Sequence, residues 1–219
     1  MTNVTANYSD GYSTDGKTIK ILGIVGSIRA NSNNKGLLRA AHEEAPEGVI
    51  IETFDVGQLP LYNQDLDANP PAIVVEWKRR VREADALLIA SPEYNYSVSG
   101  VLKNALEWAS RPPKESPLRE KPVAIMGAGG VTGTARGQAH LRQILFGTRS
   151  RTMFEPELMV ARSWEKFDAE GNLTDQSTRE GVRGLVQALV EWTNQVNHEL
   201  HDEALPYVVP QAPEAVVVH

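Results

Sequence analysis

Short apolar runs alternate along the chain with longer segments whose apolar residues recur at helical spacing. The runs are rich in Val, Ile and Leu, as buried strands are. They cover residues 20–25, 49–54, 85–90, 122–126 and 153–160, the last of them interrupted by Pro156. The sequence therefore predicts five short strands separated by amphipathic helices.

Each segment between the strands carries an apolar stripe on one side, as a helix packed on a sheet does. Val74, Trp77 and Val81 form such a stripe after a long loop over residues 55–71. Helices are expected over 35–44, 73–84 and 101–109, around 141–145, and over 182–196. This alternation is typical of an α/β fold with a parallel sheet and helices on both faces.

Two polar segments flank the predicted domain, which spans residues 19–197. Residues 1–18 are rich in Ser, Thr, Asn and Gly, and we expect a flexible leader there. Residues 198–219 contain Pro and Glu and end in Val-Val-Val-His. We expect this tail to be loose or packed on a neighbouring subunit.

The composition narrows the classes of function. The 219 residues carry a net charge of −6, which argues against a nucleic-acid or acidic-membrane partner because those require clustered basic surface. The chain has no cysteine, so a disulfide, a thiolate nucleophile and a cysteine-based metal site are all excluded. With no long apolar run and no secretory signal, a cytoplasmic protein is expected.

In a parallel sheet of this type the ligand lies beyond the carboxyl ends of the strands. The loop after the first strand, residues 26–34, is rich in anion-binding groups, because a helix start and a forked cation both favour negative charge. Its candidates are Ser27, Arg29, Ser32, Asn33 and Asn34. The loop suits a monophosphate and lacks the motifs of a nucleoside triphosphate or dinucleotide site, although a capped turn with a solvent-facing arginine is the simpler alternative.

The loop after the third strand, 91-SPEYNYSVSG-100, combines aromatic rings with an amide side chain. Pro92 keeps the chain extended at Ser91. Tyr94 and Tyr96 flank Asn95, a combination that suits a flat heteroaromatic ring with polar edges. A tyrosine-rich turn that merely covers the core is the alternative, but the place of the loop at the predicted ligand edge favours a binding role.

The loop after the fourth strand, 127-GAGGVTG-133, is rich in glycine and would let a ligand approach the backbone closely. Gly127, Gly130 and Gly133 do not have the spacing of a dinucleotide turn, and a flexible connection is the alternative. Together, a monophosphate pocket, a flat-ring pocket and a glycine-rich wall at one sheet edge describe a site for flavin mononucleotide (FMN). No single loop carries that prediction.

The sequence resembles the flavodoxin-like NAD(P)H-dependent FMN reductases, a family that includes bacterial quinone, azo-dye and chromate reductases. The resemblance covers about residues 19–195. The matching blocks are Gly26-Ser27-x-Arg29-x-x-Ser32-x-Asn34, Leu59-Pro60-Leu61-Tyr62, Ser91-Pro92-Glu93-Tyr94-Asn95-Tyr96-Ser97, Gly100-x-Leu102-Lys103-Asn104-Ala105, Gly130-x-x-Gly133-x-Ala135-Arg136-x-Gln138 and Leu141-Arg142-Gln143.

The resemblance implies a five-stranded sheet of order 2-1-3-4-5 and a role for each matched position. Ser27, Arg29, Ser32 and Asn34 would hold the FMN phosphate. The flavin ring and ribityl chain would contact Pro92, Glu93, Tyr94 and Asn95, and the ring's polar edge would pass Gly127, Gly130 and Gly133. Tyr96 and Arg136 would lie on the side where nicotinamide and then the acceptor bind, or at a subunit contact.

The family also implies a homodimer or homotetramer with the flavin near a subunit interface. Ala139 stands where relatives often carry an aromatic residue, and Thr134 where a second glycine is common, which leaves the acceptor and the subunit contacts open. The expected activity is hydride transfer from NAD(P)H, with NADPH favoured, through FMN to a quinone, azo compound, metal oxyanion or free flavin. A flavodoxin-type electron carrier, a flavin-based redox sensor and a nicotinamide-only dehydrogenase are the alternatives.

Overall fold

A computed structural model of the protein describes residues 18–202. The expected leader, apart from Thr18, and the tail beyond residue 202 lie outside the described residues. The strands form one sheet in which every pairing is parallel, in the order β2-β1-β3-β4-β5, with β6 also paired to β4. The predicted strand order is therefore confirmed. The strands are β1 Ile19–Val25, β2 Val49–Phe54, β3 Ala86–Ala90, β4 Pro122–Ala128, β5 Arg151–Thr152 and β6 Leu158–Val160.

The fifth place in the sheet is shared by two short strands. β5 pairs with the start of β4, at Pro122 and Val123, and β6 pairs with its end, from Met126 to Ala128. The segment between them contains Pro156, which has no N–H to donate to a neighbouring strand. The strand predicted over residues 153–160 therefore forms only at its end, as β6, and β5 lies just before the predicted start at Met153.

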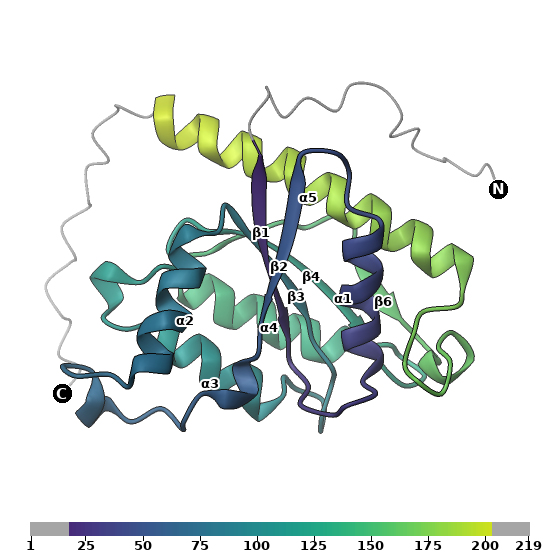
Figure 1. Cartoon of the computed structure of the whole chain (residues 1–219), viewed down its shortest axis with the longest axis horizontal. Coiled ribbons are helices and arrows are strands. Elements are labelled where there is room, and N and C mark those ends of the chain that lie inside the picture. The colour runs from purple at the N-terminus through teal and green to yellow at the C-terminus, as the bar shows by residue number, and fades with distance from the viewer. Residues whose placement is uncertain (1–17, 203–219) are drawn as a thin grey trace, which may run out of the picture.

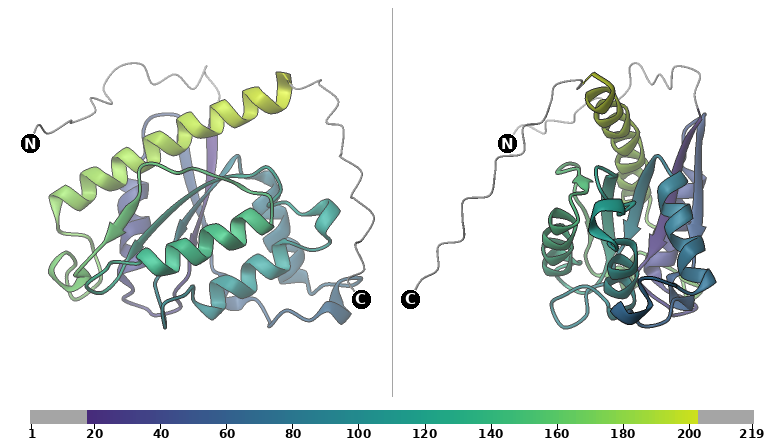
Figure 2. Two further views of the ribbon diagram at one scale, coloured as in Figure 1. Left: turned by 180° about the vertical axis from the view of Figure 1, so that it is seen from behind. Right: turned by 90° about the vertical axis from the view of Figure 1, so that its left-hand side faces the viewer.

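Five α-helices cover the two faces of the sheet within residues 18–202. They are α1 Asn33–Glu43, α2 Ala72–Glu83, α3 Gly100–Ala109, α4 Ala135–Gly147 and α5 Gln176–Asp202. One buried cluster joins the sheet to α1 and α5, and a second joins it to α2, α3 and α4. Figure 1 and the left view of Figure 2 show α5 as a long helix along one side of the molecule.

Several boundaries differ from the sequence prediction, and two of the differences bear on the predicted loops and tail. β4 extends to Ala128, so Gly127 belongs to the strand and not to the loop. α5 continues to Asp202, beyond the end expected near Val196, so the first residues of the predicted tail are helical. Leu189, Val190 and Val196 are buried on the face that α5 presents to the sheet, and the helix runs past the last of them.

The carboxyl ends of β1, β3 and β4 meet at one edge of the sheet. The ladder continues past the strand ends, because the N–H of Gly26 donates to the Ala90 carbonyl and the N–H of Ser91 to the Met126 carbonyl, both at 2.9 Å. The three loops singled out in the sequence therefore start side by side.

Candidate active site

The first loop offers two buried serine hydroxyls at the start of α1. Ser27 is 6 % exposed and Ser32 is 4 % exposed, and among residues 18–202 neither hydroxyl has a hydrogen-bond partner. Ser32 is the N-cap of α1 in an extended conformation, and its side chain does not bond to the helix. The hydroxyls and the first-turn N–H groups are thus left available to an anion.

Arg29 lies on the exposed side of the same loop. Its Nη2 donates to the carbonyl of Asn31 at 3.0 Å, and the Asn31 side chain donates to the carbonyl of Ala169 at 3.2 Å. Gly171, with φ of +79°, sits close against the Asn31 backbone. The turn after β6 therefore braces the loop, a contact that the sequence did not indicate.

Asn34 has a structural role that differs from the predicted one. Its side chain is buried, its Nδ2 donates to the Ala128 carbonyl, and its Oδ1 accepts from the Ala128 N–H, both at 3.0 Å. Because both ends of the amide are committed to the end of β4, the phosphate contact predicted for Asn34 would come from its backbone. Asn33, the first residue of α1, is half-buried, and no bond joins its side chain to another described residue.

The second loop forms a tight hairpin at the end of β3. Tyr94 and Ser97 exchange both backbone hydrogen bonds at 3.0 Å. Asn95 and Tyr96, between them, have φ of 50° and 64°, the left-handed region that a type I′ turn requires. The turn holds the two tyrosine rings outward, where 48 % of Tyr94 and 64 % of Tyr96 are exposed.

Glu93 ties this hairpin to the start of α4. Its Oε2 accepts from the Gly137 N–H at 2.9 Å, which supplies the cap that the side chain of the N-cap residue Thr134 does not give. Its Oε1 lies 3.7 Å from Nη1 of Arg136, whose guanidinium carbon is 4.3 Å from the centroid of the Tyr96 ring. Glu93, Arg136 and Tyr96 thus form one electrostatically linked set.

Next to this set, His140 of α4 bonds through Nδ1 to the Ser97 hydroxyl at 3.0 Å. The bond fastens α4 to the hairpin a second time. This agrees with a structural role for the histidine.

The three candidate glycines at the end of β4 and in the loop after it are required for different physical reasons. A Cβ at Gly127 would lie 2.2 Å from the Thr134 hydroxyl and 2.5 Å from the Ser91 carbonyl, so packing within the protein accounts for this glycine, in contrast to the expected ligand approach. Gly133 has φ of +63° and lies against the Met159 backbone. At Gly130 a Cβ would meet open space, which agrees with a backbone wall that a ligand can approach.

A cleft of about 550 Å³ brings the second and third loops together. Its lining consists of Glu93, Asn95, Tyr96, Gly130, Thr132, Gly133 and Arg136. All of these except Thr132 were candidates in the sequence. Thr132 lies within the glycine-rich stretch, and a threonine in a turn gave no signal of its own.

The first loop lines a separate cleft of about 410 Å³ beside α1. Ser27 contributes to it, together with Lys35, Arg39 and His42, which were not predicted. Their spacing on α1 places three basic side chains on one side of the helix. This spacing is visible in the sequence, but it lies in a helix and outside the three candidate loops.

Two other kinds of feature, a metal-binding group and a membrane-spanning helix, are absent from residues 18–202. No group of three or more His, Asp or Glu side chains there is placed to hold a metal ion. No helix within this part of the chain is long and apolar enough to cross a membrane.

The sheet order and the site at its carboxyl edge define a flavodoxin-like α/β protein. Residues 19–165 match the model of the family described as NADPH-dependent FMN reductase, and the chain belongs to that family.

Named relatives agree with this membership. The chain is 48% identical over 181 residues to an NAD(P)H-dependent FMN reductase of Pseudomonas aeruginosa, an alignment that covers 81% of this chain and 97% of the relative. It is 43% identical to an NADPH:quinone oxidoreductase of Arabidopsis thaliana, over 80% and 92% of the two chains. The structure superposes on a flavoenzyme NAD(P)H:(acceptor) oxidoreductase of Paracoccus denitrificans with a TM-score of 0.75 and 35% identity, covering 81% and 98%.

Proposed function

We propose that the protein is an FMN-dependent NAD(P)H oxidoreductase whose acceptors include quinones. The observation that carries the proposal is the cleft that joins the 93–96 hairpin to Gly130, Gly133 and Arg136 in a chain of the FMN reductase family. Relatives named as quinone reductases, at 37–43% identity, support quinones as the acceptor class.

The residues of the first loop fit a phosphate monoester. Ser27 and Ser32 supply buried hydroxyls, which among residues 18–202 are not used by the fold, and the start of α1 supplies N–H groups and a positive dipole end. Arg29 and Asn33 stand at the rim of the same loop. Asn34 contributes its backbone and keeps the loop fixed to β4.

The fit for the flavin ring rests on the two facing loops. Pro92, Tyr94 and Asn95 would contact the ring and ribityl chain from the β3 side, held by the tight hairpin. Gly130 and Gly133 would present backbone to the polar edge of the ring from the β4 side. Glu93 positions this arrangement through its bonds to α4.

Bound FMN supplies the redox chemistry, by accepting hydride from the nicotinamide and passing the reducing equivalents to the acceptor. Tyr96 and Arg136 would bind both molecules in turn at their side of the cleft, and the backbone at Gly130 and Gly133 would contact the ring edge. The rigid hairpin holds the reacting partners at a fixed orientation. No side chain is needed as a nucleophile.

NADPH is the favoured co-substrate in this proposal. The Arg136 side chain is 49% exposed at the cleft, so its guanidinium can pair with a 2′-phosphate when that group displaces the weak contact to Glu93. The ratio of kcat/KM for NADPH to that for NADH, measured on wild type and Arg136→Ala, tests this. Loss of Arg136 should reduce the ratio, and the NADH arm serves as the internal control.

The proposed protein is a cytoplasmic homodimer or homotetramer built on one domain over residues 19–197. Exposed apolar side chains in the loops of the carboxyl edge support a subunit contact near the flavin: Ile28, Tyr94, Tyr96, Val131 and Trp164.

Anaerobic addition of NADPH to the FMN-loaded protein tests the function. The visible absorbance of the flavin should bleach within the mixing time and return when a quinone is added. A flavin that NADPH does not bleach would indicate an electron carrier. A colourless protein that takes up no FMN on titration would indicate a nicotinamide-only dehydrogenase.

A further inference from the structure

A second cavity, of about 390 Å³, lies at the opposite edge of the sheet from the proposed flavin site. It is formed where α3 and α4 end, beside the segments that lead into β4 and β5. Four of the residues that line it are basic: Arg111, Lys114, Arg119 and Arg149. No acidic side chain is among its lining residues, in a chain with a net charge of −6.

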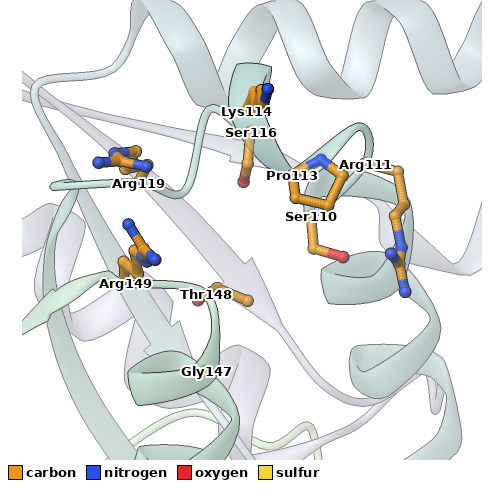
Figure 3. Close-up of a pocket in the computed structure, with 9 residues that line it drawn as sticks. All are labelled: Ser110, Arg111, Pro113, Lys114, Ser116, Arg119, Gly147, Thr148 and Arg149. Atoms are coloured by element: carbon orange, nitrogen blue, oxygen red, sulfur yellow. The ribbon is translucent and has the colours of Figure 1, made fainter. Parts of the chain in front are cut away.

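These four side chains have no acidic partner within residues 18–202, where none of them takes part in an ion pair. In Figure 3, Arg119 and Arg149 stand on the same side of the cavity, and both also line a neighbouring cavity of about 690 Å³. The guanidinium groups of Arg119 and Arg149, on the same side of one cavity, repel each other unless an anion lies between them.

The negative ends of the two helix dipoles favour positive charge here, but in the described part of the chain the basic side chains are not held by hydrogen bonds to the helix ends. The Ser110 hydroxyl donates to the Glu107 carbonyl at 2.8 Å, and the Thr148 hydroxyl donates to the Leu145 carbonyl at 2.9 Å. Carbonyls at both helix ends are thus capped by short hydroxyl side chains, and among residues 18–202 the basic side chains donate to none of them.

Arg149 occupies a backbone position that normally takes glycine. Its N–H donates to the Phe146 carbonyl and the next N–H, of Ser150, donates to the Leu145 carbonyl, the pattern of a Schellman motif that ends α4. Its φ of 60° is in the left-handed region, which costs free energy for a residue with a Cβ. Arg111 lies over the Tyr62 ring at 6.0 Å from its centroid, whereas a strained arginine beside cations that lack acidic partners within residues 18–202 suggests that the Arg149 side chain serves binding.

We propose that this cavity binds the phosphate group of a small phosphorylated molecule, with Arg119 and Arg149 as the two guanidinium forks and Lys114 as a further positive charge. Planar forks match the oxygens of a phosphate in a bidentate manner. The cavity volume is within the range of small-molecule sites. The site is independent of the proposed redox function, since it lies at the amino ends of the strands.

Calorimetric titration of the full-length, FMN-loaded protein at low salt tests the proposal, because bound FMN blocks the phosphate loop near Ser27. Pyrophosphate and ADP are the probes, and citrate is the carboxylate comparison. We expect saturable one-to-one binding of pyrophosphate that weakens as salt is raised. Tighter binding of ADP would show that a nucleotide is preferred, and equal binding would show that phosphate alone is recognised; both support the site.

Three variants locate the binding. Arg119→Gln should weaken pyrophosphate binding by about tenfold or more. Arg149→Gly should weaken it similarly, yet raise the Tm by about 2–4 °C because glycine relieves the backbone strain. Arg183→Gln removes one positive charge from α5, where Glu44 keeps Arg179 as a partner, and should leave binding unchanged.

Several results would overturn the proposal. The first is the absence of saturable pyrophosphate binding at low salt. The second is a loss of pyrophosphate affinity in Arg183→Gln equal to that in Arg119→Gln. The third is citrate binding as tight as that of pyrophosphate. A lower Tm for Arg149→Gly would show that the arginine is kept for folding, against the argument from strain. Reductase turnover should be the same in all variants, so a failed redox function is distinguishable from a failed anion site.

Discussion

At the scale of single residues, the sequence identified side-chain chemistry better than side-chain direction. Ser27 and Ser32 keep hydroxyls without a partner among residues 18–202, and Arg29 lies on the exposed side of the same loop, so their phosphate role stays a prediction. The Asn34 side chain is directed into the protein and bonds to β4, and the backbone of Gly127 packs closely against Thr134. Both directions depend on which strand lies next to the loop, and residue type alone does not contain that information.

Arg29→Ala should weaken FMN binding by about 10- to 100-fold, because a charge-assisted hydrogen bond contributes about 1.5–3 kcal/mol. Titration of the FMN-free protein with FMN, followed by fluorescence quenching, measures the effect. Arg82→Ala, on an exposed arginine of α2, is the matched control and should bind FMN normally. If Arg29→Ala alters only the affinity for NAD(P)H, the loop is assigned to the wrong ligand.

Asn34→Ala should lower the free energy of unfolding by about 2–4 kcal/mol, because it leaves the buried N–H and C=O of Ala128 without their partner. Chemical denaturation of the FMN-free protein measures this without interference from the ligand. Asn33→Ala, one residue earlier, should change stability by less than about 0.5 kcal/mol. Similar losses in both variants would mean that helix propensity, and not the bond to β4, is responsible.

At the scale of elements, the apolar patterns located β1 to β4, β6 and the five α-helices of residues 18–202, but not β5 or the short 3-10 helices. The fifth place in the sheet is shared by β5 and β6, with Pro156 between them, and the sequence indicated the interruption but not a strand before Met153. Hydrogen bonds between elements, such as that from the Asn31 side chain to the Ala169 carbonyl, join residues far apart in the chain. No local sequence pattern indicates such bonds.

The start of α5 makes the stability of the protein depend on pH. Asp175 accepts from Lys166 Nζ at 2.8 Å and from the Thr178 N–H at 2.9 Å. The hydrogen bond from Lys166, followed by those from Thr178, lowers the pKa of Asp175 from 3.8 to about 2. Because the pKa is lower in the folded protein than in the unfolded chain, this stabilisation is present above about pH 4 and is lost as the pH falls through about 2.

Asp175→Asn should therefore be less stable than wild type at pH 6, and the difference should shrink as the pH is lowered from 4 towards 2. Urea denaturation at a series of pH values measures the difference. Lys166→Met and the double variant complete a cycle that isolates the ion pair from the helix cap. A difference that stays constant over the whole pH series would show that the carboxylate charge contributes nothing.

At the scale of the whole molecule, exposed apolar side chains occur at both edges of the sheet, and some of those at the carboxyl edge flank the candidate cleft. Trp164 and Val131 are 59 % and 77 % exposed in loops that follow β6 and β4. Exposed apolar groups of this size mark interaction surfaces. This distribution supports an oligomer whose subunits meet near the flavin cleft.

Light scattering should give two or four times the chain mass of 24.1 kDa. Trp164→Asp should shift the mass towards the monomer, because a charge would be buried in the contact. Phe146→Asp, at a side chain 84 % exposed at the opposite edge, is the matched control and should keep the wild-type mass. A wild-type mass of one chain would refute the oligomer.

The sequence by itself determined the α/β class, the order of elements and the three loops that carry the chemistry, because apolar periodicity and turn residues are local properties. Family-specific blocks, such as Ser91 to Ser97, added the cofactor. The tertiary structure decided which polar groups the fold uses and which it leaves open at the candidate site. It combined the second and third loops in one cleft and turned Asn34 towards β4. It also gathered Arg119 and Arg149 at the far edge, since only folding brings residues from different loops within range of the same anion.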